Sequence, residues 1–407
     1  MTRVFPRSVL LVYLLAGATA CTEGGEAPTV EVALSDSAGV PVRTFPHTPE
    51  TLPAWSVEPA PLLEIGAVTG EGPTVFSRVG AVRLTEDGGV VVTDELAGEI
   101  REFGPDGSHR GSMGGSGEGP GEFGNSIALP HLAGDTVYAW DGRVRRLSIF
   151  VGGAFDQSWI PPSEGAVSDV TFVRDRLYGQ SGVSFSGMPE TGLSRPGTRY
   201  GVLEPDGSYE GFFEVSGPER YIDIQTSGGS ISAIAVFQTP FARGAFFTVA
   251  AAATHDRILG GPNDRFVLHE WDARDGVLVA VHRYPGLDDL VTESDVERAR
   301  DRIRERFDEP DARMRTELET LADNVPEYAP AFDRIWPDDA GRLWLRHTAA
   351  EDGEEWFVFG LDDLTPLGRL TLPAGFALMD VRDGLLAGRW QDALDIAYVR
   401  VHRLRMN

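Results

Sequence analysis

Most of the chain consists of short runs of alternating apolar and polar residues, separated by clusters of Gly, Asp and Pro. The clearest series lies between Val75 and Phe123. Residues 79–84 (VGAVRL) alternate, as expected of a strand with one buried face. Residues 90–93 (VVVT) form a dense β-branched run, which is typical of a strand buried on both faces. The pattern therefore predicts β-strands over this part of the chain.

Turn-forming residues divide this series into four strands. Residues 86–89 (EDGG) predict one hairpin turn and residues 105–107 (PDG) predict another, because Gly tolerates positive φ and Asp and Pro favour turns. Residues 98–103 and 109–113 supply the third and fourth strands. Four strands within about 45 residues match the period of one blade of a β-propeller.

The same strand–turn–strand pattern recurs along the chain. Five further units follow the first, at residues 135–150, 201–213, 266–281, 338–359 and 376–402. Repetition of β units at a spacing of roughly 40–60 residues excludes a helical solenoid and favours a propeller over a sandwich. We therefore predict an all-β fold, a six-bladed β-propeller, over residues 29–407.

A closed ring requires the two chain ends to pair, because an open blade would expose edge strands. The last unit is short of one strand. Residues 30–34, 41–45 and 62–66 could each supply it. We favour the segment around Leu62 as the partner of the C-terminal unit.

Residues 291–325 depart from the β pattern and predict a short helical hairpin inserted between the fourth and fifth units. Apolar residues recur there at helical spacing on both sides of Pro310. Thr292 or Ser294 could cap the first helix. The hairpin could pack over the rim of the ring, or it could serve as a lid or a partner-docking arm. Its outer face is expected to carry charged residues such as Arg300, Arg304, Glu305 and Glu317.

The first 20 residues have the three parts of a signal peptide. Arg3 and Arg7 give a positive start, residues 8–18 form an apolar core, and small residues precede Cys21. The apolar core is shorter than the roughly 20 residues that a membrane span needs. Cys21 is the only cysteine, so no intrachain disulfide can form.

The small residues before Cys21 resemble the lipobox of bacterial lipoproteins, with Ala18 where leucine is usual. This resemblance implies that residues 1–20 are removed and that Cys21 is the lipid attachment site. An ordinary signal cut after Ala20 is the alternative. Residues 21–28 are polar and Gly-rich, which predicts a flexible tether. Thr22 is not the aspartate that signals inner-membrane retention, so we expect an exported protein anchored to the cell envelope, at the outer membrane.

The chain is strongly acidic, with 62 Asp and Glu residues against 36 basic residues and a formal net charge of −26. Such a surface repels phosphate backbones, which argues against nucleic-acid binding. Every basic residue among the 36 is arginine. The absence of lysine excludes Schiff-base chemistry and a P-loop lysine.

Residues that could carry chemistry are sparse. Some Asp and Asn residues near strand ends could hold calcium at a tunnel mouth, but turns favour the same residue types. These residues are Asp94, Asn125, Asp141 and Asn263. Three histidines have no partner at metal-ligand spacing and fit loop or core positions better. They are His131, His255 and His347.

Ser116 and the tryptophans are weaker candidates still. Ser116 lies in a GGSG run that fits a loop between blades better than a nucleophile turn. The tryptophans could stack on sugars, but several recur at equivalent strand places, so packing between blades explains them more simply. This set comprises Trp140, Trp159, Trp271, Trp344, Trp356 and Trp390. The sequence therefore predicts no catalytic residue, no metal site and no cofactor.

The first unit also resembles the NHL-type repeat of six-bladed propellers. Its turns, its strands and the closing residues 117–123 (GEGPGEF) follow the order of that repeat. Glu99 departs from the repeat, which usually has Arg there, whereas the second unit keeps Arg143 and Arg146 near that place. With its lipoprotein signal, the chain is similar to NHL-like or TolB-like propeller lipoproteins of bacteria, a family of unknown function. The resemblance implies a fold and a ring count, not an activity.

Two functions remain open at this point. The first is a binding or scaffold protein of the cell envelope that uses the propeller face to recognise a protein, a peptide or a glycan. The second is an extracytoplasmic propeller enzyme, such as a calcium-dependent lactonase or esterase, or a lyase. Three or more Asp, Asn or Glu side chains converging at the tunnel mouth would favour the enzyme. We favour the binding protein.

Overall fold

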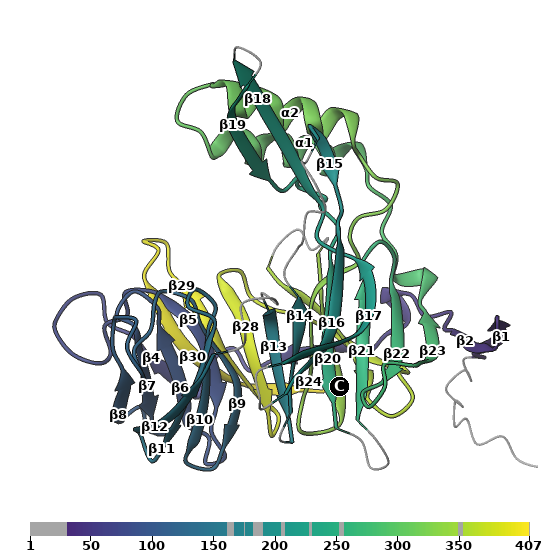
Figure 1. Ribbon diagram of the computed structural model, residues 1–407. Helices are drawn as coiled ribbons and strands as arrows, with labels where there is room; N and C mark the ends of the chain where they lie inside the picture. The colour runs from purple at the N-terminus through teal and green to yellow at the C-terminus, as the bar shows by residue number, and fades with distance from the viewer. Residues whose placement is uncertain are drawn as a thin grey trace, which may run out of the picture.

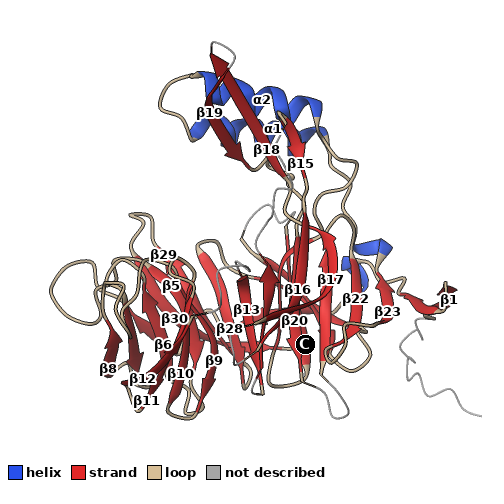
Figure 2. Ribbon diagram, viewed as in Figure 1, coloured by secondary structure: helices blue, strands red, loops and turns tan. Residues whose placement is uncertain are grey.

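The computed structural model describes residues 31–160, 167–174, 176–181, 190–204, 208–227, 230–251, 256–348 and 353–406. Cys21, the predicted signal peptide and His255 lie outside these residues. The described chain forms six antiparallel four-stranded units arranged as a ring, with an arm standing on one side (Figures 1 and 2). The prediction of a six-bladed β-propeller is confirmed.

The first three blades use strands in chain order from the axis outward. Blade 1 comprises β5 (Val79–Leu84), β6 (Val90–Asp94), β7 (Glu99–Phe103) and β8 (His109–Gly114). Blade 2 comprises β9 (Ile127–Ala133), β10 (Thr136–Asp141), β11 (Arg146–Val151) and β12 (Ala154–Trp159). Blade 3 comprises β13 (Val167–Val173), β14 (Arg176–Ser181), β16 (Gly197–Leu203) and β17 (Tyr209–Ser216).

The remaining blades complete the ring. Blade 4 comprises β20 (Ala245–Ala250), β21 (Arg257–Pro262), β22 (Val267–Asp272) and β23 (Leu278–Arg283). Blade 5 comprises β24 (Phe332–Pro337), β25 (Arg342–His347), β26 (Glu355–Gly360) and β27 (Pro366–Thr371). Blade 6 comprises β28 (Phe376–Arg382), β29 (Leu385–Gln391), β30 (Ala397–Arg405) and the N-terminal β4 (Leu63–Ile65). Innermost strands of neighbouring blades contact one another, β5 with β9, β9 with β13, β13 with β20, β20 with β24, and β28 with β5.

The two chain ends meet in blade 6, as the pattern around Leu62 predicted. β4 pairs antiparallel with β30, with Ile65 opposite Val399 and Leu63 opposite Val401. Because β4 supplies the outer strand of blade 6, the ring is closed by strand pairing. An unpaired edge of β30 is thereby avoided.

The segment before β4 forms a belt across three blades, which the sequence did not reveal. A hairpin of β1 (Ala33–Ser37) and β2 (Val40–Thr44) adds to blade 4, where β2 runs parallel to β23. A 3₁₀ turn (Pro49–Thr51) leads to β3 (Ala54–Val57), which lies between β27 of blade 5 and β30 of blade 6. The belt therefore ties blades 4, 5 and 6 together.

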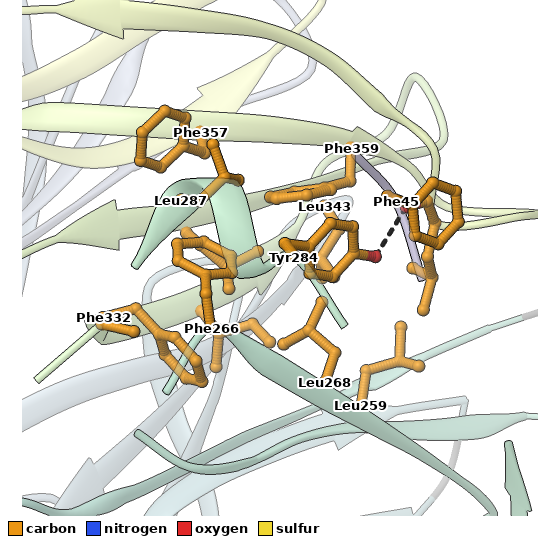
Figure 3. Packing of buried hydrophobic residues seen from close by; sticks show 14 of the residues in the cluster. Phe45, Leu259, Phe266, Leu268, Tyr284, Leu287, Phe332, Leu343, Phe357 and Phe359 are labelled. Atoms are coloured by element: carbon orange, nitrogen blue, oxygen red, sulfur yellow. Dashed lines mark hydrogen bonds between the residues drawn. The ribbon is translucent and has the colours of Figure 1, made fainter. Parts of the chain in front are cut away.

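Aromatic side chains fill the space between blades 4 and 5. Phe266, Phe357, Phe359 and Tyr284 pack there with the belt residue Phe45, and all are buried (Figure 3). The rings of Phe45 and Tyr284 stack with centroids 5.0 Å apart. The Tyr284 hydroxyl donates to the Leu364 carbonyl at 2.7 Å. Each such large side chain contributes about 1.5–3 kcal/mol when fully buried.

An arm rises from one face of the ring, and three separate connections build it. β15 (Gly192–Ser194) interrupts the link from β14 to β16, and β18 (Arg220–Ser227) and β19 (Ser230–Phe237) lie between β17 and β20. Helices α1 (Glu293–Glu305) and α2 (Ala312–Asp323) lie between β23 and β24, after a 3₁₀ turn (Pro285–Leu287). In an antiparallel blade, the link between the second and third strands and the link to the next blade lie on the same face. We call it the arm face (Figure 1).

The helical half of the arm confirms the predicted hairpin. Thr292 caps α1: its hydroxyl accepts the Asp295 N–H, and the Asp295 carboxylate accepts the Thr292 N–H. Ala299, Ile303 and Leu321 form the buried seam between the helices. Among the described residues, no helix is long and apolar enough to span a membrane.

The sheet half of the arm was not expected, because the sequence suggested only one insert. β15, β18 and β19 pair as a separate three-stranded sheet in the order β15-β18-β19. Phe241, in the segment after β19, packs into the core of the helical hairpin. The two halves of the arm are therefore joined.

The prediction that Glu317 lies on the outer face of the hairpin is wrong. Its side chain is only 2% exposed. The carboxylate lies between the guanidinium groups of Arg306 and Arg313, and Arg313 contacts it at 3.0 Å. Two arginines compensate for its charge, so an acid that looked solvent-facing in the sequence can be buried.

Candidate functional site: a cleft beneath the arm

A cleft of about 870 Å³ lies where the arm meets the tops of blades 4 and 5. Its walls come from residues 238–242 after β19, from the start of the helical hairpin, and from the start of β24. Segments that are distant in sequence thus enclose one space. A volume of roughly 300–1,000 Å³ is usual for a small-molecule pocket.

One loop of blade 4 holds the chain segments that shape this cleft. Asn263, which follows β21, accepts the Gly244 N–H at 2.7 Å through its side-chain oxygen and donates to the Phe332 carbonyl at 2.8 Å. These bonds fix the chain entering β20 and the chain entering β24. Asn263 is 1% exposed, so the bonds are shielded from water.

The next residue, Asp264, anchors the sheet half of the arm. Arg195 forms a two-pronged ion pair with it, at 2.5 and 2.8 Å, and also donates to the carbonyls of Gly217 and Gly244. Arg243 lies 3.4 Å from Asp264 and pairs with Glu219. Although partial burial opposes it, pairing with Arg195 holds the pKa of Asp264 below its usual value. These residues flank the three arm strands, so the base of the sheet is fixed.

Arg265 anchors the helical half in the same way. It donates to Asp288 at 2.8 Å, and its guanidinium lies 3.7 Å from the centre of the Tyr328 ring. Asp288 precedes α1 and Tyr328 follows α2, so both ends of the helical insert contact one side chain. Cation–π contact of this kind is worth about 0.5–1 kcal/mol at exposed sites.

His347 joins the helical insert to blade 5 beside the cleft. Its Nε2 lies 3.1 Å from Asp289 and its Nδ1 lies 3.2 Å from Glu355. Burial opposes protonation, but the two carboxylate hydrogen bonds outweigh burial and raise the pKa of His347 to about 9. The ring is thus an imidazolium at neutral pH with both nitrogens donating. It braces Asp289, which lines the cleft.

Opposite charges line the walls of the cleft. Asp289 and Asp333 come from the segments before α1 and at the start of β24, and Asp295, Arg298 and Arg302 come from α1. Asp333 pairs with Arg346 at 2.6 Å, and Arg346 also pairs with Glu354 at 2.7 Å. Arg302 is exposed and forms no ion pair with any residue in the described ranges. It is a cation available to a ligand.

The Asp and Asn residues considered for calcium have architectural roles instead. Asp94 accepts the N–H groups of Ser77 and Arg78, at 2.9 and 3.0 Å. Asp141 accepts the Gly124 N–H at 2.6 Å, and Asn263 does the same for Gly244. Each lies at the end of a second strand and caps the chain that enters the first strand of its own blade. Asn125 contributes its backbone carbonyl to Arg78, at 2.8 Å.

These side chains are thus hydrogen-bonded within their own blades. Within the described ranges, no group of three or more His, Cys, Asp or Glu side chains has a metal-binding arrangement. Ser116 lies in the loop between blades 1 and 2, where it bridges to Phe123. His131 is partly buried on β9 and packs on Tyr138 and Phe172.

Packing explains the tryptophans, as the sequence suggested. Trp344 and Trp356 are fully buried between blades 5 and 6, and Trp55 of the belt packs edge-on against Trp344. Trp140 and Trp271 are also buried. None of the tryptophans lines the cleft.

The residues that shape the cleft were largely missed from the sequence. Asn263 was singled out, but its neighbours Asp264 and Arg265 were not. The available signal was the run Asn263-Asp264-Arg265, three polar residues in succession between two strands of a blade. Their partners lie far away in sequence, so no local pattern could identify them.

Comparison with known proteins adds little to this description. No protein-family model and no curated protein matches the chain. Among solved structures, a putative exported protein from Bacteroides fragilis is similar, with 10% identity and a TM-score of 0.47 over 87% of this chain and 99% of that one. A streptogramin B lyase has 11% identity and a TM-score of 0.38 over 85% and 97%. A putative gluconolactonase has 13% identity and a TM-score of 0.39 over 86% and 93%. The propeller assignment rests on the strand pairing itself.

Proposed function

We propose that the protein is an exported binding protein of the cell envelope that holds a polypeptide ligand in the cleft beneath the arm. The carrying observation is that three insertions, separate in the chain, emerge on one face and enclose a ligand-sized space. A propeller ring does not need an arm in order to close. Two adjacent side chains, Asp264 and Arg265, hold both halves of the arm in place.

The polar groups around the cleft support binding better than chemistry. His347 uses both ring nitrogens on carboxylates, so neither is available as a base. Asp94, Asp141 and Asn263 satisfy backbone N–H groups within their own blades. Nothing in this arrangement favours the lactonase or lyase alternative.

The lining supports a polypeptide rather than a glycan. Sugar rings stack on exposed aromatic side chains. The aromatic residues of the cleft are Phe241, which is 8% exposed, and Phe246, which packs edge-on against Phe332. Acidic and basic groups together in one cleft suit the paired charges and termini of a polypeptide.

Export and lipid attachment complete the proposal. The signal-like residues 1–20, followed by Cys21 and a polar tether, would place the propeller outside the cytoplasm, anchored to the outer membrane through an acylated Cys21. The first described strand, β1, begins at Ala33 at the outer edge of blade 4. The tether would leave the arm face free to meet a ligand.

The test is selection of binders from a phage-displayed random dodecapeptide library against the chain without residues 1–21. Affinities of synthetic copies are then measured by calorimetry on matched variants. Ala329→Trp should fill the cleft and weaken binding at least about tenfold. Ala340→Trp, in a turn on the opposite face, is its control.

Two charge-reversal variants make the test sharper. Arg302→Glu removes the unpaired cation of the cleft, whereas Arg315→Glu makes the same charge change at an exposed position of α2. The proposal expects loss of affinity in the first and not in the second. It fails if no peptide is selected, or if cleft and control variants bind equally well.

A further inference from the structure

The arm sheet ends in an edge strand without the usual protection. Within the described part of the chain, β19 pairs with β18 on one side and with no strand on the other. Residues 224–242 contain no charged residue, in a chain of which 24% is charged. Natural edge strands carry charge or Pro that prevents pairing with other chains. An uncharged edge points to a partner.

The regular part of this edge is short and well defined. The β18–β19 ladder has a bulge at Ser232, and pairing is regular from Ala233 to Phe237. Ile234 and Val236 are 49% and 46% exposed. Being two residues apart on a strand, they point to the same face of the sheet.

We propose that the partner is a second copy of this chain, whose β19 pairs antiparallel with β19 about a twofold axis at Ala235. In this register Ile234 of each copy lies opposite the partner's Val236. The two three-stranded sheets become one sheet of six strands. Aliphatic cross-strand pairs of this kind stabilise a sheet, in addition to the backbone hydrogen bonds.

The arrangement of side chains favours a second copy over an unrelated extended peptide. A twofold interface must be self-complementary. Within the regular segment from Ala233 to Phe237, the two exposed large aliphatic residues lie at equal distances on either side of Ala235, and the small Ala235 side chain lies on the axis. A foreign peptide would not require this symmetry.

Charge supports the same choice. Each copy carries a formal charge of −26, so two copies repel each other over most of their surfaces. A charged side chain near the twofold axis would face the same charge on the partner, and residues 224–242 contain none. Figure 1 shows the arm sheet standing above the ring, and most residues of β19 are exposed.

The experiment is sedimentation velocity on the chain without residues 1–21, over a concentration series from about 1 to 200 μM. We expect a reversible monomer–dimer equilibrium. Val236→Lys should weaken the dimer at least about tenfold, because it places a charge in the aliphatic pairs. Val279→Lys, on β23 outside the arm and 40% exposed, is the matched control. Circular dichroism checks that each variant is folded.

A charge-swap variant tests the register directly. Ile234→Glu combined with Val236→Lys places opposite charges against each other across the twofold axis, so the double variant should recover dimerisation that both single variants lose. A monomer at every concentration overturns the proposal, as does a failed rescue or an equal effect of Val279→Lys.

A monomer whose peptide binding is weakened by Val236→Lys would show instead that the edge receives the ligand, which also overturns the proposal. Peptide affinity of Arg302→Glu is measured separately, so the binding function can fail or survive independently.

Discussion

Tyr284 connects blades 4 and 5 through one buried hydrogen bond, so its hydroxyl tests how the ring is held together. The hydroxyl donates to the Leu364 carbonyl at 2.7 Å, and the side chain is 0% exposed (Figure 3). Burial raises the pKa of Tyr284 well above its ordinary value. The hydroxyl therefore remains a donor throughout the pH range of a folding experiment.

The Tyr284→Phe substitution keeps the ring and removes only the hydroxyl. The Leu364 carbonyl then loses its donor in a site that water does not reach, at a cost of about 1–3 kcal/mol. Leu364 has a φ of 57°, a left-handed conformation that non-glycine residues adopt at a cost. The hydrogen bond helps to hold this conformation. We therefore expect the free energy of unfolding to fall by about 1–3 kcal/mol.

Urea denaturation followed by tryptophan fluorescence measures this change. Tyr398→Phe is the control, since the Tyr398 hydroxyl has no hydrogen-bond partner among the described residues and the same atom is removed. The control should change stability by less than about 0.5 kcal/mol. If Tyr284→Phe has an effect as small as the control, the interblade hydrogen bond does not hold the ring as argued.

Four further predictions concern the residues that hold the arm, the closure of the ring, and the predicted lipid attachment at Cys21. Asp264→Ala should raise hydrogen exchange in β18 and β19 while blades 1 and 2 keep their protection. An equal rise in exchange throughout the chain would contradict the role of Asp264 in holding the arm sheet. His347 has a folded pKa of about 9 against an ordinary 6.5, so its stabilising charge pairs are fully present below pH 6.5 and are lost as pH rises through 9. The melting temperature should therefore fall as pH rises from 6.5 through 9, and His347→Gln should remove the part of this fall that His347 causes. Deleting residues 398–407 should abolish cooperative unfolding, because it removes β30 except Ala397 and leaves β4 without its partner; a normal melting curve would count against closure by β4. Cys21→Ser should abolish palmitate labelling and membrane association in a bacterial host, whereas unchanged fractionation would argue for an ordinary signal cut.

The propeller could be predicted because its signals are local. Gly-rich and Asp-rich turns separate alternating runs, so β5 to β8 lie within a residue or two of the predicted strands. Closure by the segment near Leu62 followed from counting the strands in the last unit. Of the two residues expected to cap the first helix, Thr292 or Ser294, Thr292 is the cap of α1.

The arm sheet and the cleft could not be predicted because their determinants are not local. β18 and β19 alternate as blade strands do, so the sequence did not separate an insert from a blade. Asp264 and Arg195 meet across 69 positions of the chain. Glu317 looked exposed because its compensating Arg306 comes from outside its own helix.

The central claim is that the cleft beneath the arm is the ligand site. Hydrogen–deuterium exchange of the chain with and without a selected peptide tests it most directly. The account predicts protection of residues 238–242 and 289–302, with no change in the opposite-face turns at residues 85–89 and 338–341. Protection confined to those turns, or to the outer strands of the ring, would contradict it.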